Sequence, residues 1–218
     1  MMELLSLMVS KVIDIVVSNA HVKRDKPGPM RMYELYLSLR EMLKGARFVV
    51  KKIEEAMEER DDAKGIAFAI KRQAEALDNF SGNLWGIVYH LRIFDPGTGS
   101  ELCDVLGSKF VALGLWCDVL DQNRVRVPKL RRTLPELGKQ VREFMPESDC
   151  YADLEKKGVI QTQTFDLQKR SDLQQLRSQA LENIAKMESA LARLADSIRE
   201  NCEMKDLFVN TTTFEWRR

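Results

Sequence analysis

The sequence predicts an all-α protein, folded as a single multi-helix bundle with long antiparallel helices and a long C-terminal helix. The composition is rich in Glu, Lys, Arg, Leu and Ala and has only 11 Gly and 6 Pro among 218 residues, which favours helix. Apolar residues recur with alternating spacings of four and three over residues 30–60 and again over 166–203. Residues 84–120 place two apolar helical segments on either side of a Pro/Gly turn, and we expect this hairpin to form the centre of the core. We assign residues 1–205 to the bundle and 206–218 to an extended tail.

Charge and cysteine content bear on whether the protein binds nucleic acid, membranes, zinc or a cofactor. The formal net charge is +1, so any attraction to nucleic acid or to an anionic membrane must come from a local patch. The four cysteines form no Cys-x-x-Cys pair and the chain has only two histidines, so we expect neither a zinc site nor a cofactor. Unpaired cysteines of this kind fit a reducing cytoplasm, which is where we expect the protein to be.

Residues 2–20 are predicted to form a helix that is apolar on nearly every side. Its polar residues fall on one narrow stripe at helical spacing: Glu3, Ser6, Ser10, Asp14 and Ser18. A helix of this kind is either enclosed by others or able to enter a lipid interface. Its charges and its length fall short of a membrane span, and it lacks the basic start of a signal peptide. Residues 21–29 break the helix, with Pro27-Gly28-Pro29 as the stop, and a basic cluster lies here, formed by His21, Lys23, Arg24, Lys26 and Arg31.

Two long helices are expected next, over residues 30–60 and 63–93. The first carries a seven-residue repeat on its buried side: Leu35, Leu39, Met42, Ala46, Val49, Ile53 and Ala56. The buried side of the second, which Gln73 interrupts, is formed by Ile66, Ile70, Leu77, Phe80, Leu84, Val88 and Leu91. Gly82 and Gly86 leave a flat patch on the second helix, where we expect a neighbouring helix to approach closely.

The middle of the chain contains a turn and an extended segment. Residues 95–99 end one helix, and Thr98 with Glu101 three positions later is a capping-box pattern that predicts the start of the next. Residues 124–128 alternate between arginine and valine and end in proline, which favours an extended conformation.

The C-terminal third is predicted to be mainly helical. Short helices are expected over residues 134–145 and 148–157, and Gly158 ends the second of them. The residues from 162 to 164 are predicted to lie in a loop. A last helix over 166–203 would be roughly 55 Å long, so it bends, pairs with the helix at 30–60 or projects towards a partner.

Paired carboxylates on the second and third long helices suggest one catalytic chemistry. Glu55-x-x-Glu58 is followed, after sixteen residues, by Glu75-x-x-Asp78. Carboxylates one helical turn apart on two antiparallel helices can hold Mg²⁺ through oxygen ligands. The pattern resembles that of the all-α nucleotide pyrophosphohydrolases, and this resemblance implies hydrolysis of nucleoside triphosphates. On a regular helix, however, Glu55 and Glu58 point away from Ile53 and therefore towards solvent.

Five cations within nine residues form the strongest local positive patch in the sequence. They are Arg124, Arg126, Lys129, Arg131 and Arg132. Such a patch can contact phosphate or nucleic acid. No aromatic residue is interleaved for base stacking, so a solvated loop or pairing with acidic helix faces is the competing interpretation.

Three functions follow from these features. The first is a non-catalytic scaffold, adaptor or regulatory subunit that binds a protein partner or itself; here Phe214 and Trp216 would face one side of the tail. The second is a membrane-active protein that contacts a bilayer through Leu5, Val9 and Val12. In outline it resembles the pore-forming or membrane-permeabilising bundles of cell-death and defence systems. The third is the magnesium-dependent hydrolase.

Overall fold

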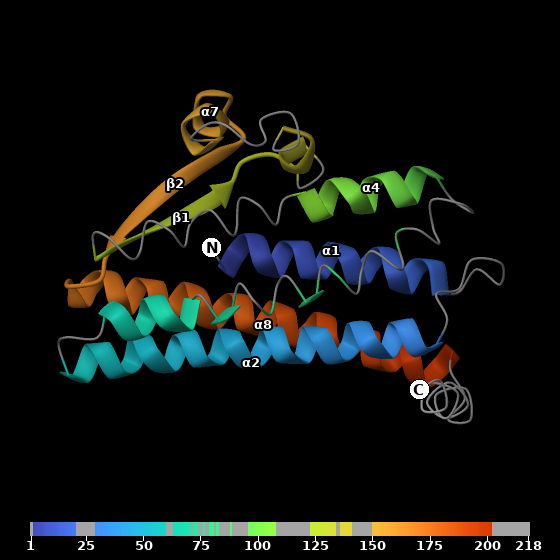
Figure 1. Ribbon diagram of the computed structural model, residues 1–218, viewed down its shortest axis with the longest axis horizontal. Coiled ribbons are helices and arrows are strands. Elements are labelled where there is room, and N and C mark those ends of the chain that lie inside the picture. The colour runs from blue at the N-terminus through green and yellow to red at the C-terminus, as the bar shows by residue number, and fades with distance from the viewer. Residues whose placement is uncertain are drawn as a thin grey trace, which may run out of the picture.

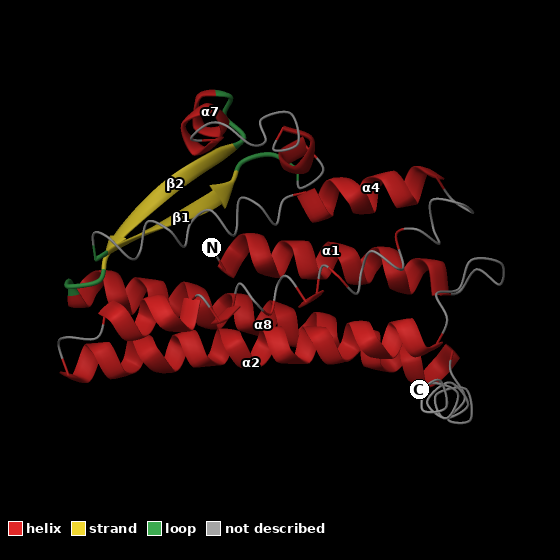
Figure 2. Ribbon diagram, in the orientation of Figure 1, coloured by secondary structure: helices red, strands yellow, loops and turns green. Residues whose placement is uncertain are grey.

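The protein is a bundle of packed helices with one small antiparallel sheet, which confirms the all-α class (Figures 1 and 2). The computed structural model describes residues 2–20, 29–59, 63–70, 72–73, 76, 79–80, 82, 88, 96–107, 123–133, 136–140 and 150–201. Its helices are α1 (Met2–Ala20), α2 (Pro29–Glu59), α4 (Pro96–Gly107), α7 (Cys150–Lys156) and α8 (Arg170–Asn201). Its strands are β1 (Arg124–Leu130) and β2 (Ile160–Asp166). The described residues between 63 and 88 are helical and are called the 63–88 segment, and residues 136–140 are helical as well.

Helix α8 lies at the centre of the described bundle. It packs along both α1 and α2, so the last described helix holds the first two together (Figure 1). The expected seven-residue repeats carry this packing. All seven repeat residues of α2 from Leu35 to Ala56 are buried, as are Ala180, Ile184, Met187 and Leu194 on α8. The long C-terminal helix therefore pairs with α2, which is one of the three alternatives expected from its length.

Helix α1 is enclosed. It lies between α8 on one side and α4 with β1 on the other (Figure 1). Part of its narrow polar stripe contacts α8, whereas Asp14 and Ser18 are also exposed to solvent. The Ser6 hydroxyl, which is fully buried, donates a hydrogen bond of 2.8 Å to Oδ1 of Asn183. Further along, Arg193 of α8 contacts both Ser10 and Asp14. Polar residues inside an apolar helix are thus matched by polar residues on its neighbour.

Strands β1 and β2 form a two-stranded antiparallel ribbon at one end of the bundle. Arg124 lies opposite Asp166 and Leu130 lies opposite Ile160. The ribbon corrects the loop predicted for residues 162–164, which are the middle of β2. The alternating pattern of β1 was recognised in the sequence because its apolar residues are valines. In β2 polar side chains occupy the middle of the strand, and only the residues near its ends are buried.

The start of α8 was also predicted four residues too early. Residues up to Asp166 belong to β2, and a turn separates them from Arg170. The turn is held by Asp172, whose carboxylate accepts a 2.9 Å hydrogen bond from the backbone N–H of Asp166. The Leu167 N–H donates to the carbonyl of Asn123, so the turn is also tied to the residue before β1.

Helix α7 ends at a glycine as expected. Gly158 has a φ of +65° and donates its N–H to the Glu155 carbonyl, and the Val159 N–H donates to the Leu154 carbonyl. These two bonds form a Schellman motif, and the buried side chains of Leu154 and Val159 supply its apolar contact.

Two other helix starts differ from the sequence patterns. Helix α4 begins at Pro96, so Thr98 lies within it, and Glu101 pairs with Lys11 of α1 at 2.7 Å. A capping box is instead found at Thr133, whose N–H and hydroxyl both contact the Glu136 carboxylate at 3.0 Å.

The 84–120 hairpin lies mostly outside the described residues. Within it, the structure describes Val88 and residues 96–107, and Val88 and Leu102 are fully buried. The tail proposed for 206–218 also lies outside the described residues. The expected close approach at Gly82 is not found among the described residues, none of which has an atom within 4 Å of a Cβ built there. Gly86 lies outside the described residues.

Candidate functional site

A groove of about 590 Å³ runs along the surface between α2 and the 63–88 segment. It is called the α2 groove. Its walls combine apolar, amide and charged side chains with one glycine, and they are formed by Leu37, Ser38, Glu41, Lys44, Gly45, Phe48, Arg72, Ala76 and Asn79. These residues recur every three or four positions on each helix, so they form two facing stripes.

Exposed apolar side chains concentrate on these two helices. Tyr33 and Leu37 on α2 are each 39% exposed, and Phe68 on the 63–88 segment is 56% exposed. Tyr33 is stacked on Tyr36, with 6.4 Å between ring centroids. Among the described residues, only one other large apolar side chain is exposed, Leu181 on α8 at 40%.

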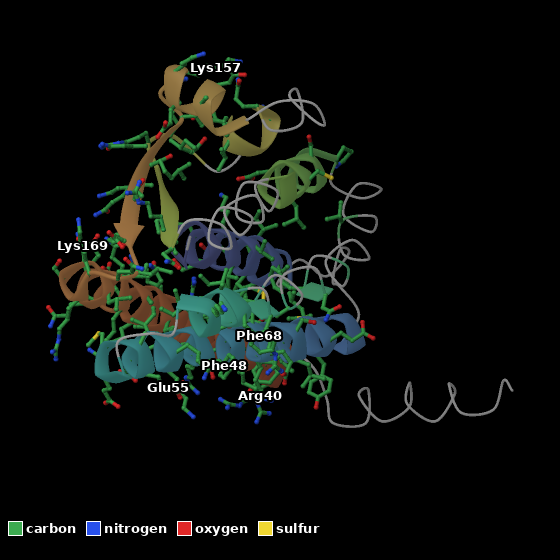
Figure 3. All side chains as sticks on the ribbon, turned by 60° about the vertical axis from the view of Figure 1, so that its left-hand side comes forward. Arg40, Phe48, Glu55, Phe68, Lys157 and Lys169 are labelled. Atoms are coloured by element: carbon green, nitrogen blue, oxygen red, sulfur yellow. The ribbon has the colours of Figure 1, made fainter. Side chains whose placement is uncertain are left out.

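Phe48 is the aromatic centre of the α2 groove. Two cations lie over its ring, with Lys52 Nζ 5.7 Å and Arg72 Cζ 5.6 Å from the ring centroid. Lys52 is neutralised by Glu55 at 2.5 Å. Arg72 forms no ion pair with any residue the structure describes, and neither does the exposed Arg40. Phe48, Phe68 and Arg40 lie on the same side of the molecule, away from Lys157 (Figure 3).

A buried amide lies beneath the α2 groove. Gln73 is fully buried, and neither its Nε2 nor its Oε1 has a hydrogen-bond partner among the described residues. It packs against Gly45, where a Cβ would be 2.1 Å from the Gln73 Oε1. The absence of a side chain at Gly45 therefore creates the space that Gln73 fills.

The ribbon carries most of the predicted positive patch. Arg124, Lys129, Arg131 and Arg132 are all exposed. The backbone places Arg126 opposite Thr164 in the same ribbon, and its side chain is not described. Four of the five predicted cations are therefore exposed, on β1 and directly after it, with Arg124 and Lys129 on opposite faces of the strand.

Hydrogen bonds to neutral oxygens orient two of these cations. Arg131 donates to the side-chain oxygen of Gln161, and Arg132 donates to the backbone carbonyl of Lys157 at 3.3 Å. Lys157 itself donates to the side-chain oxygen of Gln140 at 2.8 Å. Because the acceptors of Arg131 and Arg132 carry no formal charge, these two hydrogen bonds fix the guanidinium groups without neutralising them.

The proposed carboxylate cluster is only partly visible. Glu55 pairs with Lys52 at 2.5 Å and with Lys51 at 3.7 Å, and the Lys52 hydrogen bond is the main cause that lowers the pKa of the Glu55 carboxyl. Glu58 is exposed, as expected. Glu75 and Asp78 lie outside the described residues, and no group of metal-binding side chains is found within the described ones.

The contacts between α2 and the 63–88 segment, which would carry the proposed metal site, define how the two helices are aligned. Gln73 packs against Gly45 and Arg72 lies against Phe48, so the helices run antiparallel. Continuing this register one turn at a time places Glu55 level with the beginning of the 63–88 segment. Separately, the ion pairs described above show that the carboxyl of Glu55 is oriented by lysines of its own helix.

The residues predicted to contact a membrane or partner divide into two groups. Val9 and Val12 are fully buried in the core, and the side chain of Leu5 is not described. Phe214 and Trp216 lie outside the described residues. Among the helices that the structure describes, none is long and apolar enough to cross a membrane.

Sequence reasoning missed the α2 groove, although a signal was present. Leu37 lies between Leu35 and Leu39 of the buried repeat, and Tyr33 and Phe68 likewise fall off the repeats of their helices. Large apolar residues outside a clear seven-residue repeat mark a second, exposed apolar stripe.

We compared the chain with known protein families, curated proteins and solved structures. No protein-family model, curated protein or solved structure matches this chain.

Proposed function

We propose that the protein acts without catalysis, as a scaffold, adaptor or regulatory subunit, by binding an acidic amphipathic helix of a protein partner in the α2 groove. The observation that carries this proposal is the set of exposed apolar side chains on the two helices that form the groove: Leu37 lines the groove together with Phe48, and Tyr33 and Phe68 are exposed on the same two helices. Exposed apolar rows with a polar rim are typical of protein-binding surfaces.

The shape of the α2 groove favours a helix as the ligand. Two antiparallel helices leave a linear channel between them, and a third helix packs into such a channel with its apolar ridge. Side chains of the partner at every third or fourth position would meet Leu37, Phe48 and Phe68 in turn.

The charges of the α2 groove favour an acidic partner. Glu41 is neutralised by Lys44 at 2.5 Å, whereas Arg72 and the nearby Arg40 have no carboxylate among the described residues. A glutamate or aspartate beside the apolar stripe of the partner would pair with Arg72 over the face of Phe48. Such complementarity sets orientation and specificity more than affinity.

The membrane-active alternative is less favoured by the position of α1. Releasing α1 would expose Val9, Val12, Ile13 and Val16, all fully buried, at a cost of about 1.5–3 kcal/mol for each side chain. It would also break the contacts of the polar stripe with α8. That function stays an alternative that requires a trigger able to offset this cost.

A pair of helical probe peptides tests the proposal. Both carry leucines at the spacing of one helical stripe; one has glutamates beside the stripe, and the other has lysines. We expect fluorescence anisotropy to show binding of the acidic peptide, and Leu37→Ser to weaken it about tenfold, or ~1.4 kcal/mol. The matched control is Leu181→Ser, because Leu181 is equally exposed but lies outside the α2 groove.

A charge reversal distinguishes specific recognition of an acidic peptide from non-specific hydrophobic binding. Arg72→Glu should weaken the acidic peptide and strengthen the basic one. Equal binding of the two peptides, or equal effects of the Leu37 and Leu181 substitutions, would contradict the proposal. Light scattering without peptide completes the test: if the protein self-associates and Leu37→Ser abolishes this, the occupant of the α2 groove is a second copy instead.

A further inference from the structure

The ribbon and the residues next to it form a second surface that the α2 groove does not involve. We infer that the β1–β2 ribbon binds the phosphate backbone of a double-stranded nucleic acid through Arg124, Lys129, Arg131 and Arg132. The argument rests on the charge of this surface, on the way its cations are held and on the chemistry of the other exposed side chains.

The surface is positive because the chain concentrates cations on β1 and directly after it. Residues 123–133 contain five cations and no carboxylate. Lys139, Lys156 and Lys157 lie in the segment between β1 and β2, and Lys156 pairs with Asp153 at 3.8 Å. The described carboxylates in this region are Asp153, Glu136, Glu155 and Asp166.

Two of these carboxylates have structural roles. Glu136 caps the helix at Thr133, and the Thr133 N–H is the main cause that lowers the pKa of the Glu136 carboxyl. Glu155 accepts a 2.7 Å hydrogen bond from the backbone N–H of Thr162. They reduce the local charge but do not form ion pairs with the described cations of β1 or with Arg131 and Arg132.

The way the arginines are held suits anion binding. The guanidinium groups of Arg131 and Arg132 are oriented by the Gln161 amide and the Lys157 carbonyl. A guanidinium has five N–H donors, so each retains donors for phosphate oxygens. Part of the entropy cost of fixing a long side chain has thus been met before the ligand arrives.

Lys129 and Arg124 each have an acidic residue nearby, but neither forms an ion pair with it. Lys129 is close enough to Glu182 of α8 to help lower the pKa of that carboxyl, although Lys186 is the main cause. Arg124 is opposite Asp166, whose carboxylate lies 3.8 Å from Lys169. Both cations remain exposed and form no described ion pair.

The other exposed side chains favour a duplex over a single strand. Binding of single strands uses aromatic platforms for base stacking. The ribbon exposes no aromatic residue in its described part, since Phe165 is buried. Strand β2 instead exposes Gln161, Gln163 and Thr164, which hydrogen-bond without stacking. A two-stranded ribbon also matches the width of a major groove, about 12 Å, which admits such ribbons.

The same composition disfavours a membrane. Stable membrane binding by a basic surface uses apolar side chains that enter the lipid. The large apolar side chains exposed in the described structure lie on α2, the 63–88 segment and α8, and none is on the ribbon or α7.

The test uses the full chain with defined probes. Fluorescence anisotropy compares a mixed-sequence DNA duplex, the corresponding single strand, polyglutamate and vesicles that contain phosphatidylserine. We expect the duplex to bind best, with a slope of log K against log salt of about −3.6 for four phosphate contacts, or roughly a hundredfold loss from 50 to 200 mM salt. The double variant Arg131→Gln/Arg132→Gln should reduce this slope by about two.

A matched charge change controls for overall electrostatics. Arg40→Gln removes an exposed arginine on the other side of the molecule, away from Lys157, and should leave the slope unchanged (Figure 3). Thermal unfolding verifies that each variant is folded. Absence of duplex binding, tighter binding of vesicles, polyglutamate or the single strand, or equal effects of the Arg40 and Arg131/Arg132 changes would each overturn the inference.

Discussion

The buried amide of Gln73 leads to a prediction whose sign is opposite to that of most core substitutions. Replacing Gln73 by methionine keeps an unbranched side chain of similar length but removes the two polar atoms. Both atoms are buried without a hydrogen-bond partner among the described residues, so they lose the bonds that water provides in the unfolded chain. We therefore expect Gln73→Met to raise the free energy of unfolding.

The magnitude follows from the cost of an unsatisfied buried group. That cost is about 1–3 kcal/mol for a neutral donor or acceptor. For a chain of this size, each kcal/mol raises the melting temperature by about 2–4 °C. A gain of ~2 kcal/mol would thus appear as an increase of roughly 4–8 °C.

Gly45 provides a second, coupled measurement. In an exposed helix position, Gly→Ala usually stabilises by up to ~1 kcal/mol. At Gly45 the new methyl group would be 2.1 Å from Oε1 and 3.2 Å from Cδ of Gln73, so the amide has to move. We expect Gly45→Ala to destabilise the wild type and to be better tolerated beside Gln73→Ala, which gives a non-zero coupling in a double-mutant cycle.

Urea unfolding followed by circular dichroism measures these changes, with an unchanged m-value as the condition for comparing midpoints. Gln174→Met is the control, since Gln174 is an exposed glutamine on α8 and its substitution should be nearly neutral. The reasoning is refuted if Gln73→Met lowers the midpoint, or if Gly45→Ala has the same effect with and without Gln73.

Two further predictions concern polar contacts that join distant parts of the chain. Ser6→Ala removes the hydrogen bond to Asn183 inside the α1–α8 interface and should cost about 1–3 kcal/mol in urea unfolding, whereas Ser18→Ala, at an exposed position of the same helix, should be neutral. The pKa of Asp172 is lowered chiefly by the backbone N–H of Asp166, so its stabilising effect is present above the ordinary pKa of 3.8 and is lost as the pH falls through the lower folded value. The stability difference between wild type and Asp172→Asn should accordingly shrink in acid, and a constant difference from neutral pH to below that range would contradict the assignment.

Helix positions and their buried faces could be predicted because they depend on local pattern. The seven-residue repeats marked the buried sides of α2 and α8, and the predicted bounds of α1 agree with the structure. Gly158 was recognised as a helix end because the required positive φ is costly for other residues. These features depend on neighbours within a few positions of the sequence.

Long-range pairing could not be read in the same way. Strand β2 has a polar middle, and its pairing with β1 joins segments separated by two short helical regions. The polar stripe of α1 indicated a helix with two kinds of surface but not that Asn183 and Arg193 would meet it. The α2 groove arises because two helices pair in a particular register, and the sequence contains no local signal for that register.

The central position of α8 has a consequence for the order of folding. The ribosome makes α1 and α2 long before α8, and the contacts that enclose α1 span most of the chain, as the separation of 177 positions between Ser6 and Asn183 shows. During synthesis α1, the most apolar helix of the described structure, therefore stays exposed until α8 has been made. Proteins with such distant contacts fold slowly and expose apolar surface meanwhile, so we expect this chain to depend on holding chaperones until residues 170–201 emerge.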